Sequence, residues 1–147
     1  MNPRTAAAAA ALLLAASTLA SCTVPEPGPT APPAAADAAE LCAAFADVQT
    51  VMFNALEAQR EGRAQEHEFQ GWIRLATRVL SRIDADETTS VGAAIAQAQG
   101  EAPPVPIGRN DEGVDPLSES WGEAAEAVRT ACEAEGVEIA IEAFSGG

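Results

Sequence analysis

The residue best suited to acid–base or metal chemistry is His67, the only histidine of the chain, which lies between Glu66 and Glu68. A zinc-protease helix needs a second histidine four residues away, and a di-iron bundle needs Glu-x-x-His on two helices. The chain has neither, and Ala64 stands where the di-iron motif requires glutamate. It also lacks the Gly-x-Ser-x-Gly elbow of nucleophilic hydrolases. We therefore predict no catalytic residue and no metal or other cofactor, and we interpret His67 as a surface histidine.

Two acidic stretches, residues 84–87 and 109–115, contain oxygen ligands of the type that calcium prefers. In an EF-type loop, Gly113 at the sixth position would place Gly108 at the first, where a carboxylate is required. Asp, Asn and Gly are also ordinary turn residues. The sequence therefore favours turns without a bound ion at both places.

Three arginines are the other residues whose type and spacing could serve a function. Arg74, Arg78 and Arg82 are spaced four residues apart, so on a helix they would lie along one face, and we call them the arginine row. Guanidinium groups make bidentate contacts with phosphate and carboxylate, so the row is a candidate contact for an anionic partner. The alternative is a solvated face paired with Glu57, Glu61 and the acidic fourth helix expected at residues 116–135, where each pair would contribute only about 0.3–0.5 kcal/mol.

The acidic composition limits the classes of partner. The chain has 22 Asp and Glu against 8 Lys and Arg, and its formal net charge is −14. Such a charge opposes non-specific binding to nucleic acid and to anionic lipid head groups. We therefore predict no nucleic-acid partner, and membrane association would need something other than a basic patch.

The N-terminal residues have the pattern of an export signal. Arg4 is followed by an apolar stretch at residues 6–16, which has the length of a signal h-region and is too short for a spanning helix of about 20 residues. Leu19-Ala20-Ser21-Cys22 follows. This sequence resembles the lipobox of bacterial lipoproteins, in which a signal peptidase cuts before the cysteine and lipid is attached to its sulfur and new amino terminus.

The resemblance implies that residues 1–21 are a lipoprotein signal peptide and that Cys22 carries acyl chains of the palmitate type. Two or more such chains suffice for stable anchoring, which would hold the protein on the extracytoplasmic face of the cell membrane. The alternatives are an uncleaved anchor or ordinary signal cleavage that leaves a free Cys22 thiol. Residues 23–36 contain five prolines, so residues 22–36 are predicted to be a lipidated cysteine with a semi-rigid Pro/Ala-rich tether of up to about 40 Å.

Residues 37–147 are predicted to form one small helical domain with four helices. Apolar residues recur at helical spacing in the stretches 38–60, 64–83, 90–100 and 116–135. Asp37 is the predicted N-cap of the first, and Asp115 with Pro116 after it is the predicted start of the fourth. Trp72 and Trp121 fall on the apolar stripes and are predicted to lie in the core. The tail, residues 137–147, fits either an extended, strand-like segment or a helix, and the pattern leaves both open.

Four helices with mostly short connections predict an all-α, up-down-up-down four-helix bundle. In that topology the start of the first helix and the end of the fourth lie at the same pole. Cys42 and Cys132 fall at those two places, and an even number of cysteines in an exported domain favours a disulfide over two buried thiols. We therefore predict a Cys42–Cys132 disulfide.

These features together indicate a lipid-anchored envelope lipoprotein of unknown molecular activity. We expect a non-enzymatic binding or interaction module, attached to the membrane through acyl chains on Cys22. The expected partner is another envelope protein or an anionic cell-wall polymer, with the arginine row as the contact. The alternative is a small envelope hydrolase whose site has no recognised motif.

Overall fold

The computed structural model describes residues 37–109 and 111–144, all of which belong to one compact unit. The predicted signal peptide, the lipidated Cys22 and the tether, residues 1–36, lie outside the described residues. Within the described ranges, no helix is long and apolar enough to cross a membrane.

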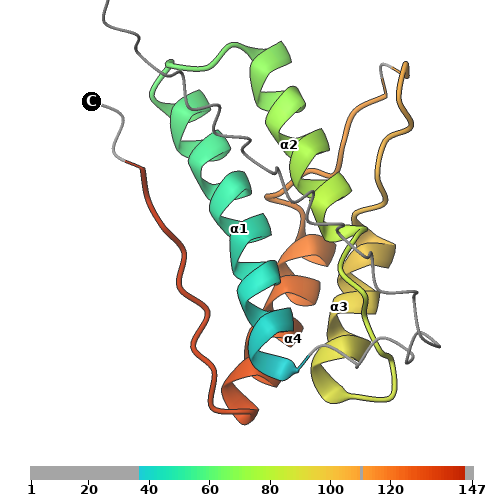
Figure 1. The fold of residues 1–147 in the computed structure, drawn as a ribbon. Helices are drawn as coiled ribbons and strands as arrows, with labels where there is room; N and C mark the ends of the chain where they lie inside the picture. The colour runs from blue at the N-terminus through green and yellow to red at the C-terminus, as the bar shows by residue number, and fades with distance from the viewer. Residues whose placement is uncertain (1–36, 110, 145–147) are drawn as a thin grey trace, which may run out of the picture. The chain divides into compact units, whose positions relative to one another are not determined.

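Four helices form the unit: α1 (Ala38–Arg60), α2 (Glu66–Leu80), α3 (Ser90–Glu101) and α4 (Glu119–Ala134). Successive helices run antiparallel, α1 packs mainly on α2, and α3 packs mainly on α4 (Figure 1). The described residues contain no strand. The predicted all-α four-helix bundle is confirmed.

Local hydrogen bonds explain where the helices begin and end. The Asp37 carboxylate accepts the Glu40 N–H at 2.8 Å, which is the predicted N-cap of α1. The Thr89 hydroxyl accepts the Gly92 N–H at 3.0 Å and caps α3. Gly62 and Gly136 follow α1 and α4 with φ of 71° and 77°, a conformation that costs glycine little.

The predicted start of α4 is wrong by about one turn. The Asp115 carboxylate accepts the Leu117 N–H at 2.9 Å, so it closes a turn that precedes the helix. The Ser118 hydroxyl is the actual N-cap and accepts the Trp121 N–H at 3.4 Å. Leu117 lies in that turn and is 76% exposed.

The core contains the apolar stripes of all four helices. Its largest fully buried apolar side chains are Phe45, Val48, Met52, Ile73, Leu80, Val91, Ile95 and Val128. Trp121 is 3% exposed, and its ring centroid lies 6.3 Å from that of Phe45, as its position on the stripe predicted. Trp72 was also expected in the core, but it is 51% exposed. It lies at the edge of the α2 stripe, beside α1, where the packing surface ends.

The C-terminal segment, residues 137–144, is extended, which is one of the two conformations that the sequence left open. It leaves α4 after Gly136 and runs as an extended chain alongside α1, without a strand partner among the described residues (Figure 1). The Val137 N–H donates to the Cys132 carbonyl at 2.9 Å and fixes the direction in which the segment starts. Its partners along α1 are side chains, and these are described below.

Candidate functional site

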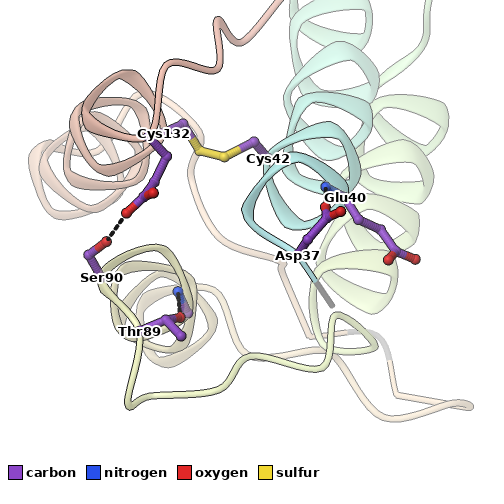
Figure 2. The surroundings of a disulfide bond; sticks show 8 residues. Asp37, Glu40, Cys42, Thr89, Ser90 and Cys132 are labelled. Atoms are coloured by element: carbon purple, nitrogen blue, oxygen red, sulfur yellow. Dashed lines mark hydrogen bonds between the residues drawn. A yellow bond between two sulfur atoms is a disulfide. The ribbon is translucent and has the colours of Figure 1, made fainter. Parts of the chain in front are cut away.

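The two predicted disulfide cysteines meet at one pole of the bundle. Cys42 lies in the opening turns of α1 and Cys132 in the last turn of α4, and both are buried. Their sulfur atoms are bonded at 2.02 Å (Figure 2). The Ser90 hydroxyl donates to the Glu135 carboxylate at 3.3 Å at the same pole, joining the start of α3 to the end of α4. This cluster is structural, since a buried disulfide has no titratable thiol.

The arginine row lies on α2 and on the turn after it. Arg74 and Arg78 are partly buried, whereas Arg82 is exposed. Among the described residues, no carboxylate lies within 4.0 Å of any of the three guanidinium groups. The ion pairs form elsewhere, within single helices or turns, and join Arg60 to Glu57, Arg63 to Glu61, Arg109 to Asp111 and Arg129 to Glu126. The two glutamates that would have neutralised the row, Glu57 and Glu61, therefore bind other arginines.

The loop between α3 and α4 packs on the flank of α2 that carries the row. A Cβ on Gly113 would lie 3.0 Å from Ile73 Cγ2 and 3.9 Å from Arg74 Cγ, so glycine allows this close approach. The Gly113 N–H donates to the Gln70 side chain at 3.4 Å. The loop thus covers the aliphatic part of Arg74, and the Arg74 Nε is buried without a hydrogen-bond partner.

The opposite flank of α2 carries an apolar hollow that the sequence did not indicate. It has a volume of about 350 Å³ and we call it the Trp72 pocket. Val51, Asn54, Ala55, Arg63, Trp72 and Phe144 are among its lining residues. Phe144, at the end of the C-terminal segment, completes the lining of the pocket. It lies 72 residues after Trp72 in the chain, a separation that no local sequence pattern spans.

Two short polar side chains of α1, Thr50 and Asn54, hold the C-terminal segment beside this pocket. The Asn54 amide donates to the Glu142 carbonyl at 2.7 Å, and its oxygen accepts the Phe144 N–H at 2.7 Å. The Thr50 hydroxyl accepts the Glu142 N–H at 3.2 Å. The spacing of Thr50 and Asn54 indicates only that they share a helix face, so this role does not follow from the sequence alone.

The residues considered for enzyme chemistry are dispersed. His67 is exposed in the first turn of α2. Within residues 37–109 and 111–144, no group of three or more His, Cys, Asp or Glu side chains converges as a metal site. Hydrogen bonds from the Thr88 hydroxyl and the Thr88 N–H to the Asp86 carboxylate lower the pKa of Asp86. That carboxylate closes the turn before α3, which is a structural role.

Comparison with known proteins gives no relative from which a function could be transferred. No protein family, curated protein or solved structure matches this chain.

Proposed function

We propose that this protein is a lipid-anchored, non-enzymatic binding module of the cell envelope, and that the arginine row contacts an anionic partner. The observation that carries the proposal is the charge environment of the row. In an acidic chain of formal net charge −14, its three guanidinium groups have no carboxylate within 4.0 Å among the described residues. An incoming carboxylate or phosphate would therefore not have to displace an internal partner.

The geometry of the row suits a partner with repeated anionic groups. Side chains four residues apart on a helix are neighbours, with about 5–6 Å between their Cβ atoms. Arg74 and Arg78 are such neighbours on α2, and Arg82 extends the row past the end of the helix. Bidentate contacts to two or three anionic groups would give orientation as well as affinity. The partner is an envelope protein or an anionic cell-wall polymer.

The proposed location is supported by separate features of the chain. The Leu19-Ala20-Ser21-Cys22 sequence resembles a lipobox, and the prolines after it suit a tether between membrane and domain. The Cys42–Cys132 disulfide suits an oxidising compartment outside the cytosol. An acidic domain is repelled by anionic lipid, so acyl chains on Cys22 would supply the attachment.

The test has two steps, both made on the full chain in its native envelope. First, the wild-type protein should sediment with membranes and Cys22→Ala should not. Second, partners are captured from detergent-solubilised envelope with wild type and with a variant that has all three residues of the arginine row changed to Ala. The matched control is Arg60→Ala/Arg109→Ala/Arg129→Ala, which removes the same charge from arginines that are ion-paired.

We expect the control to capture as much partner as wild type does, and the row variant to capture at least tenfold less. The loss should be largest at low salt, because charge contacts at an exposed surface are screened. Equal retention by both variants would show that the row is a solvated face, and equal loss would show that only net charge matters.

A further inference from the structure

The C-terminal segment is bound to α1 through its backbone. Asn54 pairs with the carbonyl of Glu142 and the N–H of Phe144, and Thr50 accepts the N–H of Glu142. All three bonds are made to main-chain N–H and C=O groups. Every residue has both groups, except that proline lacks the N–H. The α1 surface therefore recognises extended backbone, whatever the side chains of the segment are.

The side-chain selectivity of this surface comes from the Trp72 pocket. Phe144 is the residue of the segment that lines the pocket, opposite α1 and Trp72. Main-chain bonds for affinity and one side-chain pocket for selectivity are the two components of extended-peptide recognition. The surface formed by Thr50, Asn54 and the Trp72 pocket, which we call the α1 groove, has both.

The C-terminal segment is only loosely held, although it covers an apolar pocket. Ile141 and Phe144 are 45% and 63% exposed, and the three hydrogen bonds are exposed as well. Gly136 precedes the segment with a positive φ, and no helix or strand follows it among the described residues. Local opening therefore exposes little buried apolar surface and has a low free-energy cost.

We propose that the α1 groove binds an extended peptide segment of a partner protein, with a large apolar side chain in the Trp72 pocket, and that the C-terminal segment is its displaceable internal occupant. The proposal concerns the flank of α2 opposite the arginine row and does not depend on it. In the resting protein the internal segment competes with the partner. The apparent affinity is therefore the intrinsic affinity multiplied by the fraction of time for which the groove is open.

The probe is a fluorescein-labelled peptide with the sequence of residues 137–144, and its binding to the mature chain is measured by fluorescence anisotropy. Two variants weaken the internal occupant and leave Thr50, Asn54 and the helical lining residues unchanged. Phe144→Ala removes the side chain with which the segment lines the pocket, and Glu142→Pro removes the N–H that Thr50 accepts. A third variant adds Asn54→Ala to Phe144→Ala and removes two of the three hydrogen bonds that the groove makes to peptide backbone. Ile107→Ala, an exposed apolar residue of the distant loop, is the control.

We expect Phe144→Ala and Glu142→Pro to bind the peptide at least tenfold more tightly than wild type, and Ile107→Ala to match wild type. Adding Asn54→Ala should reverse the gain by at least tenfold, and circular dichroism should show that this variant is folded. The proposal would be overturned if the two tail variants did not bind the peptide. It would also be overturned if adding Asn54→Ala left the peptide affinity unchanged. Wild-type dimers that disappear in Phe144→Ala would also overturn it, because the occupant would then be the tail of a second copy.

Discussion

The Cys42–Cys132 disulfide closes a loop with a sequence separation of 90 residues, which includes nearly the whole bundle. In the chain-entropy model, a loop of that length lowers the entropy of the unfolded state by an amount worth about 4.5 kcal/mol at room temperature. Domains of this size have a total unfolding free energy of about 5–15 kcal/mol. The disulfide is therefore expected to supply a large share of the stability.

The perturbation is the double substitution Cys42→Ala/Cys132→Ala, which removes the bond without leaving a free thiol. Urea unfolding followed by far-ultraviolet circular dichroism should give a free energy of unfolding lower by about 3–5 kcal/mol. Wild type unfolded in the presence of a reducing agent is the control, because its reduced chain should have nearly the same stability as the double variant. Trimming two buried sulfur atoms explains a small remaining difference.

The outcome that contradicts the reasoning is a double variant within about 1 kcal/mol of wild type. Such a result would mean that residual helical structure already restricts the unfolded chain, or that strain in the folded state cancels the entropic effect of the bond. A double variant that is less stable than reduced wild type by several kcal/mol would instead assign the stabilisation to sulfur packing.

Gly92→Ala should lower the unfolding free energy by about 1–3 kcal/mol, because the new Cβ would overlap the Asp86 carbonyl oxygen in the turn before α3. Gly71→Ala on α2, with open space around it, should raise the unfolding free energy by about 0.5–1 kcal/mol in the same urea assay. The pKa of Asp86 is lowered by its bonds from Thr88, so its contribution is present at neutral pH and is lost as pH falls through the lowered value. The difference in urea midpoint between wild type and Asp86→Asn should therefore shrink on acidification, and a difference independent of pH would contradict this assignment.

The sequence predicted the helices well because their signals are local. Asp37 and Gly62 fix the ends of α1 through one hydrogen bond and one positive φ, and both follow from residue type. The start of α4 was misplaced because Asp115 and Ser118 are both good N-caps, and only the turn between them decides which one is used. The position of Cys132 opposite Cys42 followed from the bundle topology.

The α1 groove was not predictable, because it depends on contacts between residues about 90 positions apart. Periodicity places Trp72 on an apolar stripe, but it does not say how wide the packing surface is. The residue lies beside α1 where the core ends, and the returning C-terminal segment lines the remaining space. The tail alternates apolar and polar residues like a strand, yet its backbone partners are side chains of a helix, which no strand pattern indicates.

The arrangement separates the pole that carries the disulfide from the surface proposed for peptide binding. The described chain enters α1 at Asp37, beside the Cys42–Cys132 bond (Figure 2). With a rise of 1.5 Å per residue, Asn54 lies about 25 Å further along α1. The C-terminal segment spans this length, starting at the disulfide pole and ending at the Trp72 pocket (Figure 1). Opening of the segment from its Phe144 end would therefore free the groove while the disulfide keeps α1 and α4 joined, so binding need not weaken the bundle.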